Sequence, residues 1–188
     1  LPEGLEMINI STFKSCSSLE EIVVPDTVYS IENSAFEGCT NLETVTLPKD
    51  IEILRDRLFY NCTSLEKIHF SNDLTKLEQY VCNDCSNLVD VVLPQNLQYI
   101  RDFAFNNCKN LRHIDFSETL LGIDYYAFNN CTSLISATVG NNVDSIKFGA
   151  FVSCTSMYPS NIDRNGLYLW WMALKIFFCP DELFKDNL

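Results

Sequence analysis

The chain has 188 residues, of which 47% are hydrophobic and 20% are charged, and this is not the composition of a disordered chain. Its formal net charge of −12, from 13 Lys and Arg against 25 Asp and Glu residues, argues against nucleic-acid binding, which needs a basic surface. The longest apolar run, from Leu167 to Cys179, contains Lys175 and is shorter than the roughly 20 residues of a membrane-spanning helix. No membrane span is therefore predicted.

Seven of the nine cysteines form a strict ladder along the chain. Consecutive members are 23 positions apart: Cys16, Cys39, Cys62, Cys85, Cys108, Cys131 and Cys154. Six of them follow a Phe by three positions, and Cys82 takes the place of that Phe in the fourth copy. Because a fixed period of about 20 to 50 residues is typical of stacked repeats that share one core, the ladder predicts a solenoid.

Each repeat begins with a predicted strand. In the first repeat Leu19, Ile22 and Val24 are apolar, and the same three positions are apolar in the later copies. The alternation between Ile22 and Val24 has the period of a half-buried strand. Proline, which cannot continue a hydrogen-bonded ladder, follows the strand in three copies, at Pro25, Pro48 and Pro94. One parallel strand per coil is the expected minimum.

The rest of each repeat predicts turns and short extended pieces. Ala35, Phe36 and Cys39 have the spacing of one helical or 3₁₀ turn. The ladder cysteines point inward in this arrangement. We expect them to be reduced and buried, because coils that stack at about 4.8 Å lie slightly too far apart for an unstrained disulfide.

Two regions are predicted along the chain. Residues 1–157 form the repeat array, with about seven coils that start midway through a coil. Beyond Met157 the pattern decays, and we interpret 158–188 as a degenerate C-terminal coil that caps the core. The apolar cluster 167–172, with Phe177 and Phe178, would cover the open end, and a docking or membrane-interface helix is the alternative.

The motif Leu-x-x-Ile-x-Leu-Pro-x-x-Leu-x-x-Ile-x-x-x-Ala-Phe-x-x-Cys, read from Leu42 to Cys62, resembles the BspA-like leucine-rich repeats. The resemblance covers residues 1 to about 157. It implies an α/β repeat solenoid, right-handed, with a parallel β-sheet on the concave face and short turns, strands or 3₁₀ segments opposite. It also implies a surface or secreted protein of bacteria or protists that adheres to host matrix proteins or to other cells.

No catalytic site, metal site or cofactor is predicted. Cys82 and Cys85 are spaced as C-x-x-C, but both fill inward positions of the repeat, so a redox or zinc site is not expected. His69 and His113 lie two coils apart, roughly 10 Å, which exceeds the reach of a shared metal ion. With only six glycines there is no phosphate-binding loop, and no Ser-His-Asp arrangement stands out.

The outward side chains of the predicted strands, here called the strand face, are the predicted ligand-binding residues. They are Glu20, Glu21, Glu43, Thr44, Thr46, Glu66, Lys67, His69, Asp90, Arg112, His113 and Asp115. Glu20, Glu43 and Glu66 would stack on successive coils, where they either bind a cationic partner or splay into water and are screened.

The predicted function is therefore a non-enzymatic protein-binding or adhesion module with a protein or other macromolecular ligand. The resemblance favours a cell-surface or secreted location. Reduced cysteines and the absence of a visible signal peptide favour the alternative, a cytoplasmic scaffold or structural repeat protein.

Overall fold

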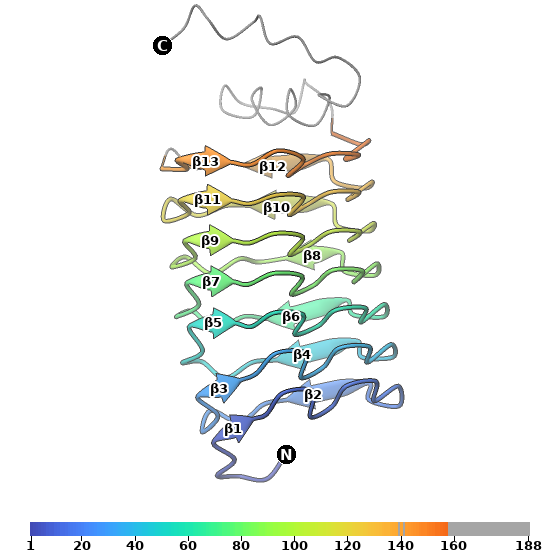
Figure 1. Ribbon diagram of the computed structural model, residues 1–188, viewed down its shortest axis with the longest axis vertical. Helices are drawn as coiled ribbons and strands as arrows, with labels where there is room; N and C mark the ends of the chain where they lie inside the picture. The colour runs from blue at the N-terminus through green and yellow to red at the C-terminus, as the bar shows by residue number, and fades with distance from the viewer. Residues whose placement is uncertain (139, 141, 158–188) are drawn as a thin grey trace, which may run out of the picture.

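A computed structural model of the protein describes residues 1–138, 140 and 142–157, and the chain winds through them as a stack of coils (Figure 1). Each coil contributes short parallel strands and tight turns. The strands are β1 (Met7–Ile8), β2 (Glu21–Val23), β3 (Ser30–Ile31), β4 (Thr44–Thr46), β5 (Ile53–Leu54), β6 (Lys67–His69), β7 (Lys76–Leu77), β8 (Asp90–Val91), β9 (Tyr99–Ile100), β10 (His113–Asp115), β11 (Gly122–Ile123), β12 (Ser136–Thr138) and β13 (Ser145–Ile146).

The even-numbered strands carry the strand face, and the odd-numbered strands line a second side of each coil (Figure 1). All strand pairs are parallel, and each residue pairs with the residue 23 positions further along, as Ile22 does with Val45 and Val45 with Ile68. One period of the sequence therefore forms one coil of the solenoid. The predicted parallel-strand solenoid is confirmed.

Both ladders are interrupted once. The strand face divides into β2-β4-β6 and β8-β10-β12, and the second side divides into β1-β3 and the five strands from β5 to β13. The two interruptions fall at different levels of the stack, so no two neighbouring coils lose contact on both sides at once.

The third side of each coil is a turn segment such as 34–38, and its backbone explains why the expected helical turn is absent. The N–H groups of Ser34, Phe36 and Gly38 donate to the next coil, with Phe36 N to Leu58 O at 3.0 Å. The alternate N–H groups donate three residues back within the turn, as Cys39 N does to Phe36 O at 3.2 Å.

Ser34 and Gly38 also have positive φ angles of 59° and 73°, which interrupt any right-handed helix. The described part of the chain contains no helix, so the α component of the expected α/β solenoid and the proposed 3₁₀ turn are not found. The backbone groups are satisfied between coils instead.

The core is built from the inward positions of the repeat. Phe rings stack along the axis, with centroids 5.3 Å apart between Phe13 and Phe36 and 5.2 Å apart between Phe128 and Phe151. The stack stops at Cys82, the one copy without a ring. Most aliphatic positions around the stack are buried, and Leu19, Ala137, Val143 and Ile146 are partly buried against the core.

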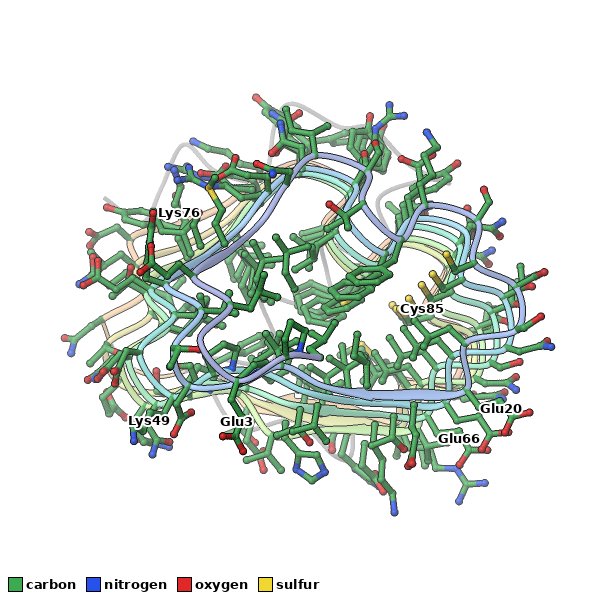
Figure 2. All side chains as sticks on the ribbon, turned by 90° about the horizontal axis from the view of Figure 1, so that it is seen from below. Glu3, Glu20, Lys49, Glu66, Lys76 and Cys85 are labelled. Atoms are coloured by element: carbon green, nitrogen blue, oxygen red, sulfur yellow. The ribbon has the colours of Figure 1, made fainter. Side chains whose placement is uncertain are left out.

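The ladder cysteines lie beside the Phe stack as free thiols, and their sulfur atoms form a row inside the turn side (Figure 2). Each thiol from Cys39 onward donates to a carbonyl of the preceding coil, as Cys62 Sγ does to Phe36 O at 3.1 Å. Cys16 is exposed, which corrects the expectation that all seven are buried, because no preceding coil covers it in the structure.

The proposed cap at 158–188 lies outside the described residues. Within the described residues, no helix is long and apolar enough to cross a membrane.

Candidate functional site

The strand face presents the predicted ligand residues in columns. Glu21, Thr44 and Lys67 stand in register on β2, β4 and β6, and Asp90 pairs with His113 on β8 and β10. Ten of the twelve predicted residues are exposed, and only Thr44 and Thr46 are partly buried. The strand pairing therefore places them on one continuous side of the molecule, although the break between β6 and β8 divides them into two groups.

The three glutamates are held one above another by the backbone. Glu43 N donates to Glu20 O at 2.7 Å, and Glu66 N donates to Glu43 O at 2.9 Å. Figure 2 shows Glu20 and Glu66 projecting outward at the same corner of the coil, on the side away from Lys76. Three exposed carboxylates thus follow one line at the start of the strands.

The side chains of this face have almost no partners within the protein. Among its twelve predicted residues, the described contacts include one side-chain hydrogen bond, between His113 Nδ1 and Ser136 Oγ at 2.9 Å. The ion pairs found in the described residues all lie elsewhere, such as Lys49 with Asp26 at 2.9 Å. The charges of the strand face are therefore free to pair with another molecule.

The second side of the coils is different, because some of its charges pair with each other. Arg101 binds Asp124 of the next coil at 3.0 Å and lies over the Tyr99 ring, 4.7 Å from its centroid. Lys76 pairs with Glu78 within one coil. Side chains in one column of this side alternate in sign along the stack: Glu32, Arg55, Glu78, Arg101, Asp124 and Lys147. This alternation supports the stacking and leaves fewer groups for a ligand.

The break in the strand face opens a hollow of about 520 Å³ between β6 and β8. After β2, β4 and β10 a backbone bond joins each coil to the next, as Leu47 N does by donating to His69 O at 3.2 Å. The corresponding bonds from Phe70 N to Val92 O and from Leu93 N to Asp115 O are absent from the described structure. The lining residues are Lys67, Ile68, His69, Phe70, Asn72, Asp90, Val92, Leu93, Pro94 and Gln95, and we call this site the β6–β8 hollow.

The hollow borders the coil in which Cys82 replaces the Phe of the repeat. Phe116 occupies the same repeat position as Phe70, two coils later, and packs its edge against Phe128 and Phe151 at centroid distances of 5.6 and 6.4 Å. The residue that corresponds to Phe128 in the coil of Phe70 is Cys82. Without that ring, Phe70 has no ring contact in the described structure and stays partly exposed beside the hollow.

Sequence reasoning found Lys67, His69 and Asp90 on the rim of the hollow but missed its apolar lining. Val92 is the largest omission, because it is outward and 84% exposed. The available signal was the substitution at Cys82, which marks the coil whose core differs from the others. A link between Cys82 and the strand face depends on how aromatic rings of neighbouring coils pack, and the sequence pattern does not show this packing.

The described residues contain no group of three or more His, Cys, Asp and Glu side chains arranged to hold a metal ion. His69 and His113 lie on β6 and β10, with β8 between them. Cys82 and Cys85 are both buried free thiols, and burial raises the pKa of Cys82 well above its ordinary value.

Two solved structures show the same fold. The T. pallidum leucine-rich-repeat protein TpLRR matches with a TM-score of 0.63 at 22% identity, over 76% of this chain and 80% of that one. The pneumococcal vaccine antigen PcpA matches with a TM-score of 0.58 at 17% identity, over 87% of this chain and 51% of that one. The chain thus spans about half the length of PcpA. Sequence comparison with curated proteins gives no match.

The family comparison rests on the repeat itself. A family model described as the BspA type leucine-rich-repeat region, with 6 copies, matches residues 6–103 and 79–169. These ranges span most of the chain and include every described strand, from β1 to β13. No enzymatic family is indicated, and the fold is typical of non-enzymatic repeat proteins. The chain belongs to the BspA-type leucine-rich-repeat family.

Proposed function

We propose that the protein is an adhesion module that binds a cationic macromolecular partner through the strand face. The observation that carries the proposal is the contrast between the two sheet sides. The second side contains two ion pairs, Lys76–Glu78 and Arg101–Asp124, whereas no partner is described for the exposed carboxylates of the strand face. A rigid surface with unpaired charges of mostly one sign favours an oppositely charged ligand.

The rigidity of the face supports a binding role. Neighbouring coils are joined by backbone bonds on three sides, or on two sides where a ladder is interrupted, so the outward side chains vary while their positions do not. A preorganised surface loses less conformational entropy when it binds, and this raises affinity for a matching partner.

A cell-surface or secreted location is part of the proposal. It is supported by the family, whose members are expected at the surface of bacteria and protists, and by the structural likeness to a pneumococcal vaccine antigen. The alternative is a cytoplasmic scaffold, which the eight free thiols of the described residues favour. Protease treatment of intact cells distinguishes the two, because only a surface protein is degraded.

The test of the binding face is a triple charge reversal at Glu20→Lys, Glu43→Lys and Glu66→Lys. Binding to a panel of immobilised basic and acidic matrix proteins is measured at low and high salt. We expect the unmodified protein to prefer basic proteins and the triple variant to bind them at least about tenfold more weakly, with a smaller salt dependence.

The matched control reverses three exposed acidic residues of a single column beside the second side, Glu6→Lys, Glu52→Lys and Asp144→Lys. It makes the same change in net charge. Glu37 and Asp84 are unsuitable controls because Glu37 pairs with Lys14 and Asp84 accepts a hydrogen bond from Asn107. Equal loss of binding in both triple variants would show that net charge, and not the strand face, determines binding.

A further inference from the structure

We propose that the β6–β8 hollow is the anchor site of the strand face, where one large apolar side chain from a basic, extended segment of the partner protein is bound. This inference rests on the proposed function and adds to it the chemistry of the partner. The hollow supplies apolar contact at one point, and Asp90 on its rim, with the other carboxylates of the strand face, supplies attraction for Lys or Arg residues of the same segment.

The hollow is a fixed feature because the same two coils are joined on their other two sides. On the second side Lys76 pairs with Tyr99 and Leu77 with Ile100. On the turn side Cys82 N donates to Ala104 O at 2.7 Å. The coils therefore cannot separate far enough to admit another strand, and the opening fits a side chain rather than a backbone.

The lining of the hollow is suited to an apolar group. Ile68, Leu93 and Pro94 are buried side chains beneath it, and Phe70 is partly exposed. Val92, the residue after β8, has 84% of its surface exposed. A volume of about 520 Å³ is ample for an aromatic or large aliphatic side chain. Ligand pockets typically combine such apolar walls with a few polar groups at the rim.

The charges near the hollow determine which residues of the partner are favoured beside its apolar anchor side chain. Among the predicted ligand residues, six are carboxylates (Glu20, Glu21, Glu43, Glu66, Asp90 and Asp115) and two, Lys67 and Arg112, are cationic. Lys67 and His69 occupy the β6 rim, whereas Asp90 occupies the β8 rim. A cationic group of the partner is therefore expected beside Asp90 and along the glutamate column.

The central position of the β6–β8 hollow on the strand face also suits an anchor site. The hollow lies between the third and fourth of the six strands on this face, so polar side chains extend from it in both directions along the stack. Residues that dominate a binding energy tend to fill pockets near the centre of an interface, where surrounding contacts exclude water.

The experiment uses the full chain and three short peptides with blocked ends: Lys-Gly-Phe-Gly-Lys, Lys-Gly-Ala-Gly-Lys and Glu-Gly-Phe-Gly-Glu. Binding is followed by amide chemical shifts in two-dimensional NMR spectra. The variant is Val92→Gln. Its matched control is Val23→Gln, because Val23 occupies the same outward position of the repeat and is 66% exposed, but lies in the intact ladder where it pairs with Thr46 of β4.

We expect the Lys-Phe peptide to bind about tenfold more tightly than the Lys-Ala peptide, with the largest shifts on β6 and β8. Val92→Gln should remove most of this preference, and Val23→Gln should leave it unchanged. The Glu-Phe peptide should bind more weakly than the Lys-Phe peptide.

Other outcomes separate the two proposals. Equal binding of the Lys-Phe and Lys-Ala peptides, with shifts along the glutamate column, overturns the anchor site and leaves the proposed function standing. A preference for Phe that survives Val92→Gln also overturns the anchor site. If neither Lys peptide shifts any strand-face resonance, or if the Glu-Phe peptide binds as tightly as the Lys-Phe peptide, the cationic-partner proposal fails as well.

Discussion

Phe70 and Phe116 occupy the same position of the repeat, yet only Phe116 is packed against other rings. Phe116 is 7% exposed and contacts Phe128 and Phe151, whereas Phe70 is partly exposed and borders the β6–β8 hollow. The difference originates in the core, where Cys82 stands in place of a Phe. One substitution in the middle of a coil thus coincides with an opening on its outer face.

The first prediction compares Phe70→Leu with Phe116→Leu. The second change removes two ring contacts from a buried site, and we expect it to lower the free energy of unfolding by about 1–2 kcal/mol. The first should cost less than about 1 kcal/mol, because leucine already fills the equivalent positions 47 and 93 and Phe70 has no ring partner in the described structure. Urea denaturation measures both, and equal costs would contradict the packing argument.

The second prediction is that Cys82→Phe completes the Phe stack. The new ring would lie between Phe59 and Phe105 and would give Phe70 the edge contact that Phe116 has with Phe128. We expect a gain of about 1 kcal/mol in the free energy of unfolding and a smaller hollow, detected as weaker binding of an apolar fluorescent dye. Cys82→Ala is the control and should lower the free energy of unfolding. A loss of more than about 1 kcal/mol in Cys82→Phe would mean that the coil is overpacked.

The repeat pattern predicted most of the fold, because inward positions recur at one period and each position pairs with its own copy in the next coil. The register of Ile22, Val45 and Ile68 follows from that period alone. The turn side was predicted less well. Local spacing around Ala35 and Phe36 resembles a helical turn, but the N–H groups bond to the next coil, an interaction that local spacing does not contain.

The turn side also contains bulky residues with positive φ angles. Tyr80, Phe103 and Tyr126 have φ angles of 60°, 59° and 57°, values that bulky residues rarely adopt. Their rings stack at centroid distances of 5.0 and 5.2 Å, an attraction that offsets part of the backbone cost. The sequence predicted the ligand face as a set of columns, but ring packing of this kind, like that at Cys82, becomes visible only when neighbouring coils are placed together.

The third prediction concerns an asparagine ladder on the turn side. Asn106 donates from Nδ2 to Asn83 Oδ1 at 2.7 Å, and Asn129 Nδ2 donates to Asn106 Oδ1 at 2.6 Å. Asn106→Ala leaves an acceptor and a donor without their partners at a site that is 9% exposed in the native protein. We expect a loss of about 1–3 kcal/mol in the free energy of unfolding. Asn87→Ala, at an exposed position, should change it by less than about 0.5 kcal/mol.

The fourth prediction concerns the thiols. Native protein at pH 7 should react rapidly with a thiol reagent at Cys16 alone among the described cysteines, because Cys16 is exposed and the other seven are buried. Denaturant should expose all of them. Mass spectrometry of the labelled peptides identifies the sites, and rapid labelling of Cys108 in the native protein would contradict the buried ladder. Cys16→Ser provides the control, which should abolish rapid labelling at the described positions.

The same thiols give the stability a pH dependence. Burial raises the pKa of Cys39 to about 11 and raises the pKa values of Cys62, Cys108 and Cys131, so the folded protein keeps protons that the unfolded chain releases above its thiol pKa of about 8.5. This contribution to stability is present in full below about pH 8.5 and is lost as the pH rises toward 11. We therefore expect the urea midpoint to fall between pH 8.5 and 10, and to fall less in a Cys62→Ala, Cys108→Ala, Cys131→Ala variant. An identical fall in the variant would assign the effect to other groups.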